Sequence, residues 1–170
     1  ISKIYQTFEP NTCIIPNGFA SMGFALPGTI AAKLVYPKKT IVAMTGDGGF
    51  LMNVQEIETA VRLKLPIIIV VWVDNDFNLI STKQKHEFGK SVFTEFSNPN
   101  FVQIAESFGA VGFHVKSPQE FLQSLESAKT IADKPVVIAV DVDYSRNEVL
   151  LDDTFPLYVD SLNHKNNNPN

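Results

Sequence analysis

The sequence predicts an α/β fold in which an open parallel β-sheet has helices on both faces, making three layers. Two continuous apolar runs, Pro66–Val73 and Pro135–Val142, are rich in β-branched residues and are typical of parallel strands covered on both faces. Segments with helical periodicity alternate with such strands, which favours right-handed strand–helix–strand crossovers. The 170 residues suit one domain, since a domain takes roughly 150 residues.

The composition excludes several classes of function. Apolar residues make up 45% of the chain and charged residues 19%, as in an ordinary globular protein. The net charge is −4 and no basic run occurs, so we do not expect nucleic acid as a partner. The longest apolar run, Ile67–Val73, is too short to cross a bilayer, so we expect no membrane association. A secretion leader is not expected, and Cys13 is the only cysteine, which favours a cytoplasmic protein.

The first predicted helix spans Met22–Tyr36, and most of its residues are small or apolar. Proline is tolerated only in the first turn of a helix, so Pro27 must lie close to the start, and Pro37 ends the helix. A compact strand, Thr40–Thr45, follows. Residues 46–49, Gly-Asp-Gly-Gly, are expected to end this strand sharply.

The clearest amphipathic helix is predicted over Met52–Lys64. Its apolar face is formed by Val54, Ile57 and Val61. Glu58 precedes Arg62 by four residues, which predicts an ion pair on the exposed face.

Three further helices are expected. One begins after Asp76, where the strand Pro66–Val73 has ended. The second has its start marked by Asn98 and the proline after it, and its end by Gly109. The third begins at residues 117–120, Ser-Pro-Gln-Glu, which form a capping box with proline in the first turn. Its inward side chains are predicted to be Phe121, Leu122, Leu125 and Ile131.

Acidic residues follow two of the predicted strands at their carboxyl ends, where open parallel sheets bind ligands. Asp47 follows the strand Thr40–Thr45, while Asp74 and Asp76 follow the strand Pro66–Val73. If the two strands are neighbours, their ends lie roughly 5 Å apart. Carboxylates that converge in this way repel each other unless a cation lies between them. Mg²⁺ suits the position, because it binds a few protein oxygens together with water and ligand phosphate.

The glycines predict the other half of the site. Gly46, Gly48 and Gly49 allow the backbone to approach a ligand closely, and the helix after them directs its N–H groups toward the same place. Taken alone, a Gly-Asp-Gly turn is more often structural than functional. Together with the acidic loop one crossover later, it predicts a site for a metal-bridged diphosphate. The three histidines show no ligand spacing, and we assign them no chemistry.

The surrounding sequence resembles the thiamine diphosphate enzymes, and within them the acetolactate synthases, most closely the catabolic, pyruvate-using form. The resemblance rests on Gly46-Asp47-Gly48, followed about 27 residues later by an acidic ligand after an apolar strand, and on segments 17–27, 56–66 and 106–109. It covers residues 12–145 and implies a thiamine diphosphate-binding fold of the pyrophosphate type. We expect this domain to occupy residues 1–158, with its first strand missing before residue 1, and residues 159–170 to form a disordered tail.

The resemblance implies roles for the matching positions. Mg²⁺ would be bound by the side chains of Asp47 and Asp74 and by the backbone carbonyl of Asp76. The residues around the diphosphate would be Gly48, Gly49, Phe77, Asn78 and Leu79. Ala20 and Met22 would lie against the rings of the cofactor. Met22 and Ile80 are the positions implied to contribute to catalysis, Met22 by supporting the bent cofactor and Ile80 by lining the pocket of the reacting carbon.

The implied reaction condenses two pyruvates to 2-acetolactate and CO₂. The general family pattern has asparagine at the position of Asp74, although the catabolic acetolactate synthases have aspartate there. The biosynthetic branch has tryptophan at the position of Lys83, and its absence favours pyruvate as acceptor. The family also implies a homodimer or homotetramer in which an N-terminal pyrimidine-binding domain of a partner subunit supplies the activating glutamate. The chain alone is therefore expected to be inactive.

Two other functions stay open on the sequence. Another thiamine diphosphate-dependent 2-oxo acid decarboxylase, carboligase or oxidase could use the same scaffold. A non-catalytic binding or assembly module could also carry these motifs.

Overall fold

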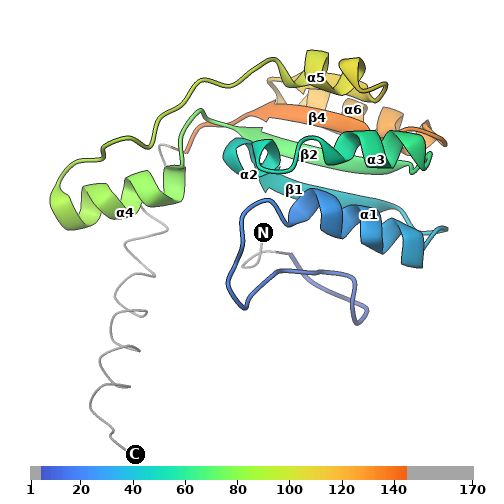
Figure 1. The fold of residues 1–170 in the computed structure, drawn as a ribbon, viewed down its shortest axis with the longest axis horizontal. Helices are drawn as coiled ribbons and strands as arrows, with labels where there is room; N and C mark the ends of the chain where they lie inside the picture. The colour runs from blue at the N-terminus through green and yellow to red at the C-terminus, as the bar shows by residue number, and fades with distance from the viewer. Residues whose placement is uncertain (1–4, 145–170) are drawn as a thin grey trace, which may run out of the picture.

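The computed structural model describes residues 5–144, which form a parallel sheet of four strands in the order β1-β2-β4-β3. The strands are β1 (Ile41–Gly46), β2 (Ile67–Val73), β3 (Val111–Val115) and β4 (Val136–Asp141). The predicted open parallel sheet is therefore confirmed (Figure 1). The expected tail at 159–170, and the expected domain beyond residue 144, lie outside the described residues.

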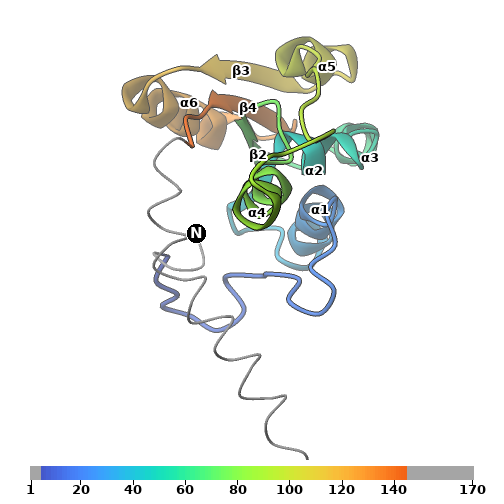
Figure 2. The same cartoon turned by 90° about the vertical axis from the view of Figure 1, so that its left-hand side faces the viewer.

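Six helices connect and extend these strands within the described residues. They are α1 (Ala25–Val35), α2 (Asp47–Leu51), α3 (Glu56–Arg62), α4 (Asn78–Phe88), α5 (Phe101–Ser107) and α6 (Pro118–Thr130). Apolar residues of α1, α2, α3 and α5 share one buried cluster with one face of the sheet, and α6 covers the other face (Figure 2). The helix α4 instead projects from the carboxyl edge of the sheet (Figure 1). None of the helices in residues 5–144 is long and apolar enough to span a membrane.

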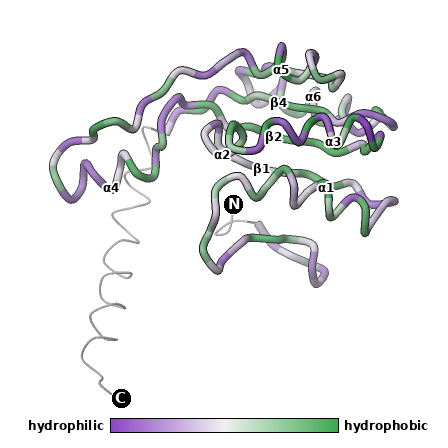
Figure 3. The backbone as a smooth tube through the Cα atoms, viewed as in Figure 1, coloured by the Kyte–Doolittle hydropathy of each residue, from purple (hydrophilic) through white to green (hydrophobic). Residues whose placement is uncertain are grey.

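The strand β2 is the centre of the core. Its first five side chains, Ile67 to Val71, are all buried, because helices cover both of its faces. Each such side chain contributes roughly 1.5–3 kcal/mol by leaving water. Hydrophobic residues continue along β2 and β4 in the interior of the molecule (Figure 3).

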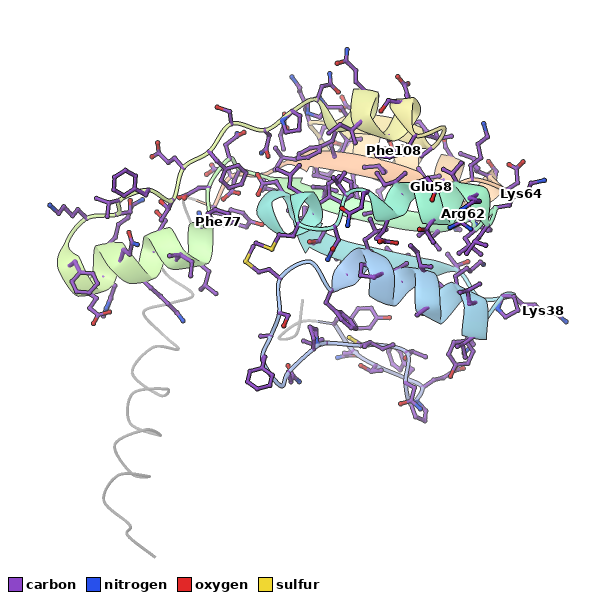
Figure 4. All side chains as sticks on the ribbon, viewed as in Figure 1. Lys38, Glu58, Arg62, Lys64, Phe77 and Phe108 are labelled. Carbon is purple, nitrogen blue, oxygen red and sulfur yellow. The ribbon has the colours of Figure 1, made fainter. Side chains whose placement is uncertain are left out.

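Two predicted surface features are confirmed. Arg62 Nε donates to Glu58 Oε1 at 3.0 Å on the exposed side of α3 (Figure 4). At the start of α6, Ser117 Oγ accepts from the Glu120 backbone N–H at 3.3 Å. The Glu120 carboxylate accepts from the backbone N–H of Lys116 at 2.8 Å, one residue earlier than in the usual capping box.

The structure corrects several predicted elements. The edge strand β3 was not predicted, because Gly112 and His114 interrupt its apolar pattern. Gly112 is required there, since a Cβ atom would lie 2.8 Å from the Cα of Val102 in α5. Asn100 rather than Asn98 caps α5, and its side chain accepts from Gln103 N at 3.1 Å. Asn98 precedes a proline, which disfavours helical backbone at that residue.

The stripe of apolar side chains that α6 turns toward the sheet is narrower than we predicted. Phe121, Leu125 and Ala128 pack against the core, and Ile131 packs at its end. Leu122 lies outside the stripe with 62% of its surface exposed, so its predicted inward position is wrong.

Candidate functional site

The carboxyl ends of β1 and β2 bring the predicted acidic residues together. The strands are hydrogen-bonded neighbours in parallel register, with Gly46 opposite Trp72. Asp47 follows β1 directly and begins α2, and Asp74 follows β2 directly. The structure thus confirms that both aspartates lie at one edge of the sheet.

Asp47 is a buried carboxylate held by N–H donors. Only 2% of its surface is exposed. Its Oδ1 accepts from the Gly48 backbone at 2.8 Å, and its Oδ2 accepts from the backbones of Asp74 at 3.2 Å and Asn75 at 2.9 Å. Oδ2 also accepts from the Asn98 side chain at 2.6 Å. These four hydrogen bonds hold the carboxylate in one orientation.

The backbone at Asn75 makes this arrangement possible. Asn75 has φ of 60°, in the left-handed region that asparagine tolerates better than most residues. Consecutive N–H groups at such a turn point to the same side of the chain, so they form a concave donor pair for an anion. Here that anion is the Asp47 carboxylate, and the acidic loop after β2 is thereby joined to the start of α2.

Asp74 has an environment that disfavours its charge. Burial, and next the charge of Asp47, raise the pKa of the Asp74 carboxyl above its usual value, although hydrogen bonds from the Asp76 backbone and the Asn78 side chain act in the opposite direction. Its Oδ2 is buried and has no hydrogen-bond partner among the described residues. The Oδ1 of Asp76 is in the same situation.

These features fit a divalent cation. Two buried carboxylate oxygens have unused acceptor capacity, and the negative charges of Asp47 and Asp74 oppose each other. Within residues 5–144, no three His, Cys, Asp or Glu side chains gather in an arrangement that could hold a metal ion. Oxygens of other kinds would have to complete the coordination, such as a backbone carbonyl or the phosphate oxygens of a ligand.

The predicted glycines lie in and next to the first turn of α2. A Cβ atom on Gly48 would meet the ring of Phe77 at 2.5 Å, and one on Gly49 would meet Thr45 Oγ1 at 2.8 Å. Gly46 has no atom within 4 Å of its Cβ position. The space beside Gly48 is therefore used by Phe77, which lies at the beginning of α4 toward α2 (Figure 4).

Apolar side chains surround this edge of the sheet and are exposed. Met22 is 50% exposed, Leu79 is 58% exposed and Ile80 is 48% exposed, the last two in the first turn of α4. Ala20 has φ of 50° and is also exposed.

The loop that carries Met22 is fixed against α2 and the residues after it. Asn53 Nδ2 donates to the Gly23 carbonyl oxygen at 2.8 Å. Gly23 has φ of 84°, and a Cβ atom there would lie 2.6 Å from Asn53 Nδ2. The sequence did not indicate Asn53 as a site residue, and no periodic or charge pattern marks it.

A cavity of about 550 Å³ opens beside Asp74. Asp76 and Tyr144 contribute to its wall. Burial, followed by the charges of Asp74 and Asp47, raises the pKa of Tyr144. The negative charges of the two aspartates therefore also act on the Tyr144 hydroxyl.

Comparison with known proteins assigns the domain to a family. Residues 1–140 match the family described as "Thiamine pyrophosphate enzyme, C-terminal TPP binding domain", and the chain belongs to this family. It is similar to a solved thiamine diphosphate-dependent 4-hydroxybenzoylformate decarboxylase of Rhodococcus jostii RHA1, with a TM-score of 0.67 and 25% identity, over 73% of this chain and 24% of that one.

Two curated relatives within this family are both acetolactate synthases. The chain is 41% identical over 156 residues to an acetolactate synthase of Bacillus subtilis (strain 168), which covers 92% of this chain and 27% of that protein. It is 38% identical over 151 residues to a catabolic acetolactate synthase of Raoultella terrigena, covering 89% and 27%. The chain thus spans about a quarter of the length of these relatives.

Proposed function

We propose that this chain is the cofactor-binding part of an acetolactate synthase, which condenses two pyruvates to 2-acetolactate and CO₂. The observation that carries the proposal is the 41% identity to an acetolactate synthase across 92% of the chain. The site at the sheet edge is compatible with it, because a buried, unpartnered acidic oxygen beside a second carboxylate suits a metal-bridged diphosphate.

The cofactors in this proposal are thiamine diphosphate and Mg²⁺. When bound, thiamine diphosphate stabilises the carbanion formed by decarboxylation and so allows a new carbon–carbon bond. Asp47 and Asp74 hold Mg²⁺ through their side chains, and Asp76 does so through its backbone carbonyl. The residues that surround the diphosphate are Gly48, Gly49, Phe77, Asn78 and Leu79.

Exposed apolar residues position the reacting end of the cofactor. Ala20 and Met22 would lie against its rings, and Met22 would support its bent conformation. Ile80 lines the pocket of the reacting carbon and excludes water from it. The exposure of Met22 and Ile80 in the chain supports these roles, because apolar side chains of this size at a ligand-binding edge suit a surface that another group covers.

The same exposure supports a partner. In this proposal an N-terminal pyrimidine-binding domain of a second subunit covers the edge and supplies the acid that activates the cofactor. The whole protein is then a homodimer or homotetramer in the cytoplasm, and neither nucleic acid nor a membrane is a partner.

Pyruvate is the proposed acceptor as well as the donor, because Lys83 occupies the position where the biosynthetic branch has tryptophan. The test gives pyruvate and 2-ketobutyrate in equal amounts to the purified full-length protein with thiamine diphosphate and Mg²⁺. We expect mainly acetolactate, and we expect Lys83→Trp to shift the products toward acetohydroxybutyrate. A dominant acetohydroxybutyrate peak from the unaltered protein would contradict the acceptor assignment.

The likeness to a 2-oxo acid decarboxylase makes simple decarboxylation the second candidate function. The same product assay separates the two, because a decarboxylase releases free acetaldehyde from pyruvate. Acetaldehyde without acetolactate would move the protein to that class.

A further inference from the structure

We propose that Asn98 is a positioning residue for Asp47. The side-chain amide of Asn98 holds Asp47 Oδ2, so that Oδ1 is the oxygen presented to the cation. This inference rests on the proposed function, which assigns the cation to this site. It concerns a residue that we had expected only to mark the start of a helix, a role that belongs to Asn100.

The geometry identifies the amide nitrogen as the contacting group. Asn98 Nδ2 lies 2.6 Å from Asp47 Oδ2 and 3.0 Å from Asn75 Oδ1. A carboxylate oxygen and the carbonyl oxygen of an amide both accept hydrogen bonds, so only the NH₂ group of Asn98 can satisfy the two at once. The bond to Asp47 is the shortest of the four that this carboxylate accepts.

The count of hydrogen bonds decides which oxygen of Asp47 is left for a ligand. Oδ2 accepts three N–H groups, from the backbones of Asp74 and Asn75 and from the Asn98 side chain. A carboxylate oxygen has about two lone-pair sites, so Oδ2 has no capacity left. Among residues 5–144, Oδ1 accepts from Gly48 N alone and so retains a site. Asn98 therefore favours binding of the cation through one oxygen of Asp47.

Asn98 reaches the site from the connection between α4 and α5. This connection is anchored independently of Asn98, because Phe77 N donates to Thr94 O at 3.0 Å and Phe96 N donates to Asn75 O at 3.0 Å. The rings of Phe77 and Phe96 are also in contact, with centroids 4.8 Å apart. A variant at position 98 should therefore keep the connection in place, and its effect should fall on Asp47.

The test measures cation binding rather than turnover. Mn²⁺ prefers the same oxygen ligands as Mg²⁺ and can be followed by electron paramagnetic resonance. The full-length protein with saturating thiamine diphosphate is titrated with Mn²⁺ to give a dissociation constant and the spectrum of the bound ion. We expect Asn98→Ala to raise the dissociation constant roughly 10–100-fold, the usual effect of removing a residue that orients a metal ligand, and to alter the spectrum.

Asn100→Ala is the matched control, because it removes the same amide two residues away. Asn100 caps α5 through Gln103 N and makes no hydrogen bond to Asp47. We expect this variant to lower the melting temperature while Mn²⁺ binds as in the unaltered protein. Equal dissociation constants for Asn98→Ala and the unaltered protein, or equal losses in Asn98→Ala and Asn100→Ala, would overturn the proposal.

Asn98→Leu keeps the approximate size of the side chain but lacks the N–H donors. It adds no charge near Asp47, so Mn²⁺ should bind about as weakly as in Asn98→Ala. Binding as tight as in the unaltered protein would show that the N–H group of position 98 is not needed, which would also overturn the positioning role. Failure of the proposed function gives a different result. In that case the unaltered protein binds Mn²⁺ and thiamine diphosphate but makes no acetolactate, and the comparison of variants still stands.

Discussion

Asp47 is almost fully buried and ionisable, yet its contacts are N–H groups rather than a basic side chain. Three of the four donors are backbone groups, so the orientation of the carboxylate is set by the fold itself. Asp74 has fewer donors, and its pKa is raised by burial and by Asp47. The Asp74 carboxyl is therefore harder to ionise than a free aspartate, and a positive charge beside it would act in the opposite direction.

The two aspartates should respond differently to substitution. In the full-length protein, we expect Asp47→Ala to abolish Mg²⁺-dependent binding of thiamine diphosphate, because it removes a cation ligand and also the acceptor that joins the loop after β2 to α2. Asp74→Asn should retain binding, since the amide keeps an oxygen ligand and removes the repulsion from Asp47. Isothermal titration calorimetry with thiamine diphosphate, with and without Mg²⁺, measures both variants.

Glu58→Ala is the control for a lost carboxylate, because Glu58 pairs with Arg62 on the exposed side of α3, away from the strand ends. It should bind the cofactor as the unaltered protein does. Unaltered thiamine diphosphate affinity in Asp47→Ala would remove Asp47 from the metal site.

At the scale of elements, the glycine-rich segment after β1 forms the helix α2 instead of an open turn. Gly46 is its N-cap, with φ of −76°, so the segment does not require glycine there for its backbone conformation. Gly48 differs, because the Phe77 ring occupies the space of a side chain. The starts of α2 and α4 are therefore in contact where the Phe77 ring packs against Gly48.

This packing predicts different effects on stability for substitutions at two nearby glycines, Gly46 and Gly48. Gly48→Ala should destabilise the protein by about 1–3 kcal/mol, the usual effect of overpacking, since a Cβ atom would lie 2.5 Å from Phe77. Gly46→Ala should stay within about 1 kcal/mol of the unaltered protein, because the loss of a favoured cap residue and the gain in backbone entropy oppose each other. Urea denaturation without cofactor compares the two variants, and equal midpoints would contradict the assigned contact.

At the scale of the whole molecule, α2 and α4 are the helices that begin at the carboxyl edge of the sheet within residues 5–144, and the edge is otherwise uncovered by helices in that range. Three apolar residues with about half of their surface exposed lie near this edge: Met22, Leu79 and Ile80. In the proposed function this edge would be half of a binding site, and its acids would hold the cation.

We accordingly expect this 170-residue chain alone to lack detectable acetolactate activity. Glu56, Glu58 and Glu106 lie on α3 and α5, away from the strand ends, and Glu95 lies beside Asp76 at the end of the site that would hold the cation. In the proposed function the acid that activates the cofactor comes from the partner subunit. A missing general acid lowers the rate roughly 10²–10⁴-fold, and poor orientation of the cofactor lowers it further. Incubation of the purified chain with pyruvate, Mg²⁺ and thiamine diphosphate is the assay, and turnover close to that of the full-length protein would show that the acid is misplaced.

Much of this architecture follows from local patterns. The apolar runs of β2 and β4 predict buried parallel strands because burial on both faces requires continuous apolar residues. The cap at Ser117 and the pair Glu58–Arg62 are confirmed because their partners lie within four residues. The approach of Asp47 to Asp74 could also be predicted, since one crossover between parallel strands leaves few alternatives for where their ends lie.

Contacts between distant segments could not be predicted in this way. Asn98 and Asn53 find partners 51 and 30 residues away, and the polarity of an asparagine does not indicate which acceptor it will meet. The strand β3 depends on pairing with β4, and the exposure of Leu122 depends on how α6 is rotated over the sheet. These features are determined by tertiary packing. Each of them depends on groups that lie far away in the sequence and that only the folded chain brings into contact.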